Sequence, residues 1–369
     1  MVRFTTAALA AALAVAFGIP SVTQVQAQVP QGYPADYSKI VDAAKKEGKV
    51  VVYSTTDSAS ANALIQDFRK LYPGVTVEYS DLNSTELYNR FIAEAASGSG
   101  TGDVTWSSAM DLQVKLAADG YALTYDSPEI PSLPKWAVFK NQAFGTTYEP
   151  ITFVYNKRLV PAEDVPQSHA DFVKLLNAKP DFYKGKITAY DPERSGVGYL
   201  FVNQDVANWP QAWDLFKAFG KESIKLYTSA GAMMERVTSG EHLVAYGIFG
   251  SYALSRSHKD PNLGIVMPKD YTLVTSRVAS ISSKAKNPNA AKLFLDYILS
   301  KRGQEIIANK AELYSLRSDV TGEATLKKVE ELIGDKARPV PINADLLEAL
   351  NQTKRLAFLK KWQAAMKGQ

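Results

Sequence analysis

A short segment that is rich in hydrogen-bond donors, Arg194-Ser195-Gly196-Val197-Gly198, precedes an apolar run that is typical of a helix. The first amides of a helix have no partner within the helix, and the aligned peptide dipoles add partial positive charge there. Glycines let a ligand approach the backbone closely, and an arginine can bind an oxyanion through two hydrogen bonds. The segment therefore predicts an anion-binding helix N-terminus. The alternative is a plain helix cap whose glycines serve packing.

Three further polar loops stand between a predicted strand and a predicted helix, at 54–58, 107–110 and 247–252. Their hydroxyl and carboxylate groups are of the kind that bind a polar ligand or cap a helix, and a capping loop can do both. The candidate binding residues in these loops are Ser54, Thr55, Thr56, Asp57, Ser58, Ser107, Ser108 and Tyr252. Asp57 either caps its helix or receives an ammonium or hydroxyl group of the ligand.

Tyrosines near these loops are candidates for stacking on a ligand or for donating a hydroxyl to it. They are Tyr148, Tyr199, Tyr246 and Tyr252. The chain holds 19 tyrosines and 15 phenylalanines, and side chains of this kind suit both a core and an organic ligand cleft. A place in the core is the structural alternative for each of the four.

The elements that must position these residues follow an alternating pattern. Short apolar runs near 50–53, 75–79 and 103–106 predict strands, and amphipathic stretches at 63–71 and 86–96 predict helices between them. Strands alternating with helices predict a parallel sheet with helices on its faces. Apolar runs at 186–190 and 243–246 repeat the pattern later in the chain.

Composition limits the class of protein. The first 27 residues combine Arg3, a short apolar run and small residues before Ala27, which predicts a signal peptide cleaved after Ala27. The 369-residue chain has no cysteine, a length that suggests two domains, and 42 basic against 38 acidic residues. Since no basic block stands out, nucleic acid is not an expected partner.

Four segments resemble the periplasmic solute-binding proteins of ABC importers, in the group that includes ferric-ion, phosphonate and sugar-phosphate receptors. They are GKVVVYSTTD at 48–57, GDVTWSSAMDL at 102–112, SGEHLVAYGIFGSYA at 239–253 and KNPNAAKLFLDYILSKRGQEIIA at 286–308. The resemblance implies an α/β, two-lobed type II periplasmic-binding-protein fold, in which each lobe is a mostly parallel sheet with helices on both faces.

The expected lobes follow from this resemblance and from two extended segments that are expected to cross between them, at 148–155 and 273–281. Lobe 1 is expected to comprise 28–148 and 275–330, lobe 2 to comprise 149–274, and 331–369 to form C-terminal helices packed on the lobes. The four polar loops would then face one cleft. Arg277 interrupts an apolar strand at the second crossing and is interpreted as another anion contact, with a salt bridge between the lobes as the alternative.

The residues that hold iron in the ferric members of this family are largely missing. The pair of tyrosines that those proteins use falls near Phe249-Gly250, the frequent histidine position falls at Asp57, and a carboxylate position falls near Ser108. The three histidines show no metal-binding spacing, and no G-x-S-x-G motif occurs. No metal, cofactor or catalytic residue is therefore expected.

These observations predict a periplasmic receptor that captures a small anionic organic solute, such as an organophosphate, a phosphonate or a carboxylate, by hinged closure of its lobes. The implied partners are the permease subunits of an ABC transporter in the inner membrane, with their cytoplasmic ATPases, and the receptor is expected to be a monomer. The alternatives are a ferric-ion or ferric-complex binding protein of the same family and, more remotely, a secreted hydrolase.

Overall fold

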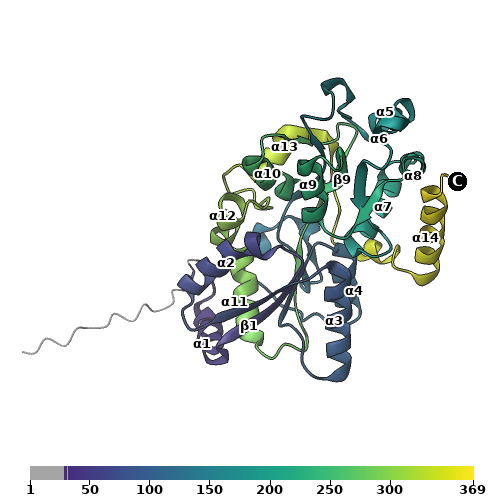
Figure 1. The fold of residues 1–369 in the computed structure, drawn as a ribbon. Coiled ribbons are helices and arrows are strands. Elements are labelled where there is room, and N and C mark those ends of the chain that lie inside the picture. The colour runs from purple at the N-terminus through teal and green to yellow at the C-terminus, as the bar shows by residue number, and fades with distance from the viewer. Residues whose placement is uncertain (1–28, 31) are drawn as a thin grey trace, which may run out of the picture.

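The computed structural model describes residues 29–30 and 32–369, which fold around two β-sheets (Figure 1). The predicted signal peptide, residues 1–27, lies outside the described residues. In the part of the chain that the structure describes, no helix combines the length and the apolar character needed to cross a bilayer.

The first sheet has the strand order β2-β1-β3-β12-β5-β4. Its strands are β1 (Lys49–Ser54), β2 (Thr76–Asp81), β3 (Val104–Ser107), β4 (Val138–Phe139), β5 (Ala143–Gly145) and β12 (Val278–Ile281). Strand β1 pairs in parallel with both β2 and β3, whereas β12 is antiparallel to β3 and β5. Val50 and Val52 are fully buried on one face of β1 and Tyr53 is buried on the other, as expected for a strand that is covered on both faces.

Helices cover both faces of this sheet. They are α1 (Ser38–Glu47), α2 (Ser58–Leu71), α3 (Ser84–Ser97), α4 (Met110–Ala118), α11 (Pro288–Leu299) and α12 (Lys301–Asn309). Figure 1 shows α3 and α4 on one side of the sheet and α1, α2 and α11 on the other. Short 3₁₀ turns are η1 (Ala35–Tyr37), η2 (Ile130–Ser132) and η3 (Lys135–Ala137).

The second sheet has the order β13-β11-β6-β9-β7-β8, with β10 paired to β6. Its strands are β6 (Glu149–Asn156), β7 (Ile187–Tyr190), β8 (Lys225–Tyr227), β9 (Val244–Phe249), β10 (Leu263–Val266), β11 (Thr272–Thr275) and β13 (Ala337–Pro339). Strand β7 is parallel to β8 and β9, whereas β6 is antiparallel to β9, β10 and β11. In both sheets the antiparallel pairs involve strands next to the crossings, so the sheets are more mixed than expected.

The helices of the second lobe are η4 (Ala162–Asp164), α5 (His169–Ala178), α6 (Pro180–Tyr183), α7 (Gly196–Asn208), α8 (Ala212–Lys221), α9 (Ala230–Ser239) and α10 (Gly250–Lys259). A buried aromatic core lies under α5 and α8 and includes Phe153, Phe172, Phe219 and Tyr246. Large aromatic side chains of this kind contribute much of the burial that holds helices on a sheet.

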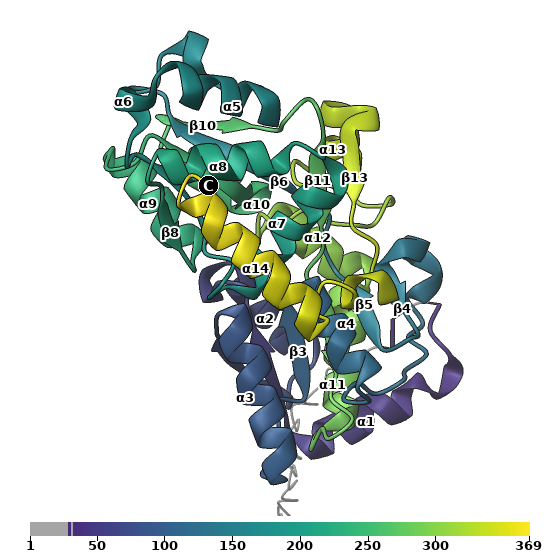
Figure 2. The same ribbon diagram turned by 90° about the vertical axis from the view of Figure 1, so that its right-hand side faces the viewer.

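The chain passes from the first sheet to the second at residues 146–148 and returns at 276–277. The remaining elements are α13 (Leu326–Ile333), η5 (Gly334–Lys336), η6 (Ala344–Leu347) and α14 (Gln352–Met366). This C-terminal segment contacts both lobes, because β13 pairs with β11, η6 packs against α4, and α14 lies along α8 (Figure 2). The predicted two-lobed α/β architecture is confirmed.

Candidate binding cleft between the lobes

A cavity of about 190 Å³ lies between the two lobes. Its lining residues are Thr55, Asp57, Asp81, Leu82, Asn83, Ser84, Glu86 and Ser108 from the first lobe and Tyr190, Ser195, Val197, Thr228, Ser229, Ala230, Phe249 and Tyr252 from the second. The volume is below the range of pockets for drug-sized ligands, so the cavity suits a small molecule.

Strand-to-helix loops position almost the whole lining. In the first lobe they connect β1 to α2, β2 to α3 and β3 to α4, and in the second lobe they connect β7 to α7, β8 to α9 and β9 to α10. Each lobe thus presents the carboxyl ends of three strands that are paired in parallel, which is where open α/β sheets bind ligands. The two lobes contribute equivalent loops to the cavity.

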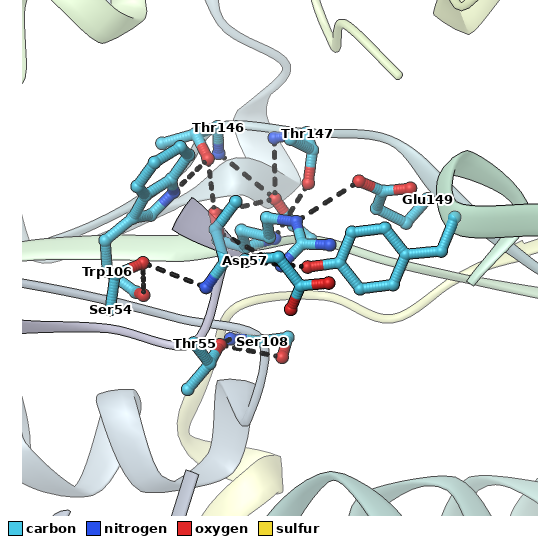
Figure 3. Close-up of polar contacts among 12 residues, drawn as sticks. Ser54, Thr55, Asp57, Trp106, Ser108, Thr146, Thr147 and Glu149 are labelled. Carbon is cyan, nitrogen blue, oxygen red and sulfur yellow. Dashed lines mark hydrogen bonds and ion pairs between the residues drawn. The ribbon is translucent and has the colours of Figure 1, made fainter. Parts of the chain in front are cut away.

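A hydrogen-bond network fixes the first-lobe floor of the cleft (Figure 3). The hydroxyls of Thr55 and Ser108 lie 3.0 Å apart, and the Ser108 amide donates to the Thr55 hydroxyl at 2.9 Å. The Thr55 amide donates to the carbonyl of Trp106 at 3.0 Å. These bonds join the loop after β1 to the loop after β3, so both hydroxyls are held at fixed positions beside the cavity.

Direct hydrogen bonds between the lobes border the cavity. The Asp57 amide donates to the Tyr252 hydroxyl at 3.0 Å, and the Val197 amide donates to the Ser84 hydroxyl at 3.3 Å. The Thr85 hydroxyl donates to the carbonyl of Arg194 at 3.2 Å. Since each bond joins a residue of one lobe to a residue of the other, the structure represents a closed arrangement of the lobes.

A buried ion pair lies at the hinge, next to the crossings. The Arg277 side chain is fully buried, and its Nε lies 3.3 Å from Oε1 of Glu149, the first residue of β6. The Nη1 atom of Arg277 donates to the Thr56 hydroxyl at 3.1 Å, and its guanidinium lies over the rings of Phe249 and Tyr252. Arg277 thereby contacts groups of both lobes.

The charges at the hinge shift one another's pKa values. Burial opposes the charged form of Arg277, but Tyr252, Glu149 and Asp57 outweigh that effect and raise its pKa. Burial raises the pKa of Glu149 and of Asp57, and Arg277 acts in the opposite direction on both. Burial also raises the pKa of Tyr252 to about 12, so this phenol is neutral at physiological pH.

Residues that the sequence predicts as binding residues separate into two groups. Thr55, Asp57, Ser108, Ser195 and Tyr252 line the cavity. Their part in ligand binding stays a prediction, but the structure brings these five together from both lobes. The other predicted residues do not line the cavity, because they serve in an ion pair, in packing or in hydrogen bonds that hold the loops.

The two arginines need correction as cavity contacts. The Arg194 side chain is exposed and is not part of the cavity lining. Arg277 is also absent from the lining, because it forms the ion pair with Glu149 that the sequence left open as the alternative. In the described part of the chain, no lysine or arginine lines the cavity.

The two glycines of the opening segment serve packing. A Cβ atom at Gly196 would lie 2.8 Å from Leu112 Cδ1 and 3.1 Å from Ser84 Oγ, both in the first lobe. A Cβ atom at Gly198 would lie 2.9 Å from the Asp191 carbonyl oxygen, within the second lobe. Gly196 therefore permits close approach of the lobes and Gly198 permits close packing of α7, so packing accounts for both glycines.

Three of the four tyrosines belong to packed regions outside the cavity. The Tyr246 hydroxyl donates to Asp205 at 2.7 Å within the second-lobe core, and the Tyr199 hydroxyl donates to the carbonyl of Ala349 at 2.6 Å. Tyr148 is buried at the first crossing. Only Tyr252 of the four lies on the cavity.

Four of the predicted hydroxyl residues form hydrogen bonds that stabilise the loops and do not face the cavity. The Ser54 hydroxyl donates to the carbonyl of Trp106 at 2.8 Å, and Thr56 accepts from Arg277. Ser58 donates to Asp81 through its amide and its hydroxyl, and the Ser107 hydroxyl accepts from the Ala109 amide. None of the four is part of the cavity lining among the described residues.

Two loops were missed by the sequence interpretation. They contribute Asp81, Leu82, Asn83, Ser84 and Glu86 after β2, and Thr228, Ser229 and Ala230 after β8. Each carries a helix cap, since the Asn83 side chain accepts from the Glu86 amide and the Ser229 side chain accepts from the Ala232 amide. A polar residue between a strand and a helix was the signal that could have identified both loops.

The chain matches the family model of the bacterial extracellular solute-binding proteins over residues 63–332, and it belongs to this family. A substrate-binding protein of an ABC transporter from Agrobacterium tumefaciens is 38% identical, with a TM-score of 0.83 over 86% of this chain and 94% of that one. The predicted resemblance and the periplasmic-binding-protein fold are confirmed, and the chain is the substrate-binding protein of an ABC transporter.

More distant structures share the fold. The periplasmic binding protein AfuA from Actinobacillus pleuropneumoniae, solved with fructose-6-phosphate, is 24% identical, with a TM-score of 0.71 over 87% of this chain and 99% of that one. Iron-bound HitA from Pseudomonas aeruginosa is 20% identical, with a TM-score of 0.69 over 86% of this chain and 99% of that one. The fold is therefore compatible with quite different ligands.

The described residues hold no group of three histidine, aspartate or glutamate side chains arranged to bind a metal ion. A larger apolar groove of about 570 Å³ lies outside the cleft and includes Leu254, Ile265 and Leu332. None of the first-lobe loops that line the cleft borders this groove. The interlobe cavity is therefore the candidate site for the transported solute.

Proposed function

We propose that this protein captures a small organic solute with an acidic group, such as an organophosphate, a phosphonate or a carboxylate, and delivers it to a membrane permease. The observation that supports this proposal is the convergence of helix N-termini on one cavity between the lobes. Helices α7 and α9 begin there with the caps Ser195 and Ser229, and α3 begins there with Ser84.

The partial positive charge at these helix starts and the hydroxyls of their caps provide the attraction for an anion. The first amides of each helix have no intrahelical acceptor, and the helix dipole places partial positive charge on them. The Ser195 and Ser229 hydroxyls accept from the Gly198 and Ala232 amides, so each hydroxyl hydrogen is free to donate to a solute. This arrangement holds an acidic group without the guanidinium that the sequence predicted.

Capture follows from differential affinity for the closed state. In an open state the second-lobe helix starts and the first-lobe loops would be separated, and only closure lets a solute contact both. A solute that bridges them stabilises closure by the difference between its affinities for the two states. The hydrogen bonds from Asp57 to Tyr252 and from Val197 to Ser84 add to the closed state. The permease would recognise that state.

The setting of this function is also proposed. We expect export to the periplasm with cleavage after Ala27, a monomeric receptor, and docking to permease subunits that are driven by cytoplasmic ATPases. The family description as extracellular solute-binding proteins supports this location. We propose a receptor without catalytic activity or a cofactor.

A thermal-shift screen tests the solute class. The chain from Gln28 is unfolded, dialysed and refolded to remove bound solute, and then mixed with organophosphates, phosphonates, carboxylates, neutral sugars and ferric citrate. At a hundred times its Kd, a ligand stabilises the folded state by about 2.7 kcal/mol, so binders raise the melting temperature. We expect organic acids to do so. A rise with neutral sugars or with ferric ion alone would contradict the proposal.

A pair of matched variants locates the acid. Ser195→Ala and Ser300→Ala each remove a helix cap, because Ser195 accepts from Gly198 at 3.2 Å and Ser300 accepts from Gly303 at 3.1 Å. Each is expected to lower stability by about 1 kcal/mol. Only Ser195 lines the cavity, so Ser195→Ala alone should weaken binding, by about fivefold in calorimetry. Equal affinities of the two variants would place the acid elsewhere.

A further inference from the structure

The two walls of the cavity differ in charge. Three carboxylate residues, Asp57, Asp81 and Glu86, line it from the first lobe. Among the described residues, the second-lobe lining contains no acidic side chain, and neither wall contains a lysine or an arginine. Helix N-termini therefore face the cavity from both lobes, but carboxylate side chains line it only on the first-lobe wall.

Two of the three carboxylates accept hydrogen bonds from residues of their own lobe. Asp81 Oδ2 accepts from the Ser58 amide at 2.9 Å, and Glu86 Oε2 accepts from Asn83 Nδ2 at 3.4 Å. Both bonds leave acceptor capacity, because a carboxylate has about four lone-pair positions. These two residues support the loop after β2 and add negative charge to the first-lobe wall.

Asp57 is the carboxylate that lies beside Tyr252 of the other lobe. Its side chain does not cap α2 and forms no ion pair among the described residues, and a hydrogen bond with Tyr252 acts to lower its pKa. Arg277 lowers the pKa of Asp57 against the raising effect of burial, but Arg277 is already paired with Glu149. In their ionised forms, Arg277, Glu149 and Asp57 carry one positive and two negative charges beside the cavity.

An independent observation on the opposite wall points to a ligand. Tyr190 is only 8% exposed and lines the cavity, and its hydroxyl forms a hydrogen bond with the Ala230 backbone but has no acceptor for its own hydrogen among the described residues. A largely buried phenol that keeps one free donor at a cavity favours a ligand oxygen at this position. Tyr190 therefore marks where an acidic group would be received, next to the helix starts of α7 and α9.

We infer that the solute is a compact zwitterion, with its acidic group at Tyr190 and the starts of α7 and α9 and a cationic amine at Asp57. This inference rests on the proposed function, because it adds the amine to a solute whose acidic group is already proposed. An acid without an amine would face three carboxylates and no side-chain cation. An amine turns the first-lobe wall from a repulsive surface into an attractive one.

Calorimetry with matched pairs of small molecules tests this inference. The pairs are 2-aminoethylphosphonate with ethylphosphonate and 3-aminopropionate with propionate, so that each pair differs only in the amine. We expect the amine to strengthen binding at least tenfold in at least one pair. Equal or tighter binding of both amine-free acids would overturn the inference and leave the proposed function intact.

Variants connect the effect to Asp57. Asp57→Asn keeps the shape and a good helix-capping residue, and it should reduce the preference for the amine to less than about threefold. Asp126→Asn is the matched control, because Asp126 is an exposed carboxylate outside the cavity, and it should leave the preference unchanged. An unchanged preference in Asp57→Asn would also overturn the inference.

Failure of the proposed function itself would look different. In that case 1,4-diaminobutane or a neutral sugar would bind while no member of the two acid pairs did. Such a result would remove the acidic group from the solute, and with it the zwitterion. If only the amine-free acids bound, the proposed function would stand and only the amine of the inferred zwitterion would be contradicted.

Discussion

Arg277 at the hinge and Arg194 at the mouth of the cleft carry the same charge in opposite environments. Arg277 is fully buried, paired with Glu149 and covered by aromatic rings, whereas the Arg194 side chain is exposed. Arg194 takes part in the contact between the lobes only through its backbone carbonyl, which accepts from Thr85. At the hinge the Arg277 charge is buried in the folded core. At the mouth the contact between the lobes is made by backbone groups and small side chains.

This difference assigns separate roles to the two regions. The Arg277–Glu149 pair holds the two crossings together, and it would persist whether the lobes are open or closed if the hinge stays packed. The Arg194 to Gly198 segment meets the first lobe only when the lobes close. Variants at the hinge should therefore change folding stability, and variants at the mouth should change solute binding.

The largest expected effect is at the hinge. Glu149→Gln leaves the Arg277 charge buried without its partner, and breaking a buried pair in this way typically costs about 3–5 kcal/mol. Urea unfolding of the variant should show a loss of that order. Replacing both residues, as in Glu149→Gln with Arg277→Met, should recover part of it, because the uncompensated charge is gone.

A surface pair is the control for this experiment. Lys49 pairs with Glu78 at 3.0 Å, their side chains are 46% and 54% exposed, and surface pairs of this kind contribute about 0–1 kcal/mol. Glu78→Gln should therefore have a small effect on the unfolding free energy. If Glu149→Gln and Glu78→Gln cost the same, the hinge pair would not have the structural role that its burial indicates.

An intermediate effect is expected at the mouth, where two glycines in one helical turn form a natural pair. Gly196→Ala places a Cβ atom 2.8 Å from Leu112 of the first lobe, so it should hinder closure and weaken solute binding by about tenfold, or about 1.4 kcal/mol. The new Cβ atom meets the first lobe and does not overpack the second lobe, to which Gly196 belongs, so the unfolding free energy should change little. Calorimetry for binding and urea titration for stability separate the two quantities.

Gly198→Ala is the matched control, because its Cβ atom would meet the Asp191 carbonyl within the second lobe. This variant should lose stability, by about 1–3 kcal/mol, through overpacking of α7 against the end of β7. If Gly196→Ala lost stability and kept its affinity, the closed arrangement of the lobes would not be the state that binds the solute.

The sequence contains enough information for the fold and only part of the site. Apolar runs such as Val50-Val51-Val52 and the amphipathic helices between them predict the layers, because burial periodicity is a local property. The position of Arg277 in an apolar strand indicated a buried charge, but its partner Glu149 is 128 residues away, and a single sequence does not encode that pairing locally.

The site could be predicted at the level of loops and less well at the level of side chains. Arg194 and Ser195 were both predicted at a helix start that faces a ligand, and the structure places Ser195 on the cavity as the cap of α7 but Arg194 outside the lining. One residue along a helix start changes the direction of a side chain by about 100°. Gly196 shows the same limit, since the close neighbour that requires a glycine comes from the other lobe. Contacts between lobes depend on their relative orientation, which local patterns do not contain.

The smallest effect is expected for Arg194→Ala, which tests the arginine at the mouth of the cleft as the Glu149 variant tests the one at the hinge. Because the side chain is exposed and lies outside the cavity lining, the variant should change both the unfolding free energy and the affinity by less than about 0.5 kcal/mol. The backbone carbonyl that accepts from Thr85 remains in the variant, so closure should be preserved. Calorimetry at low and at physiological salt checks both the affinity and any long-range attraction of an acidic solute, which salt would screen. A tenfold loss of affinity at physiological salt would mean that Arg194 turns into the cleft when a solute binds, and the mouth would then use a side-chain charge as the hinge does.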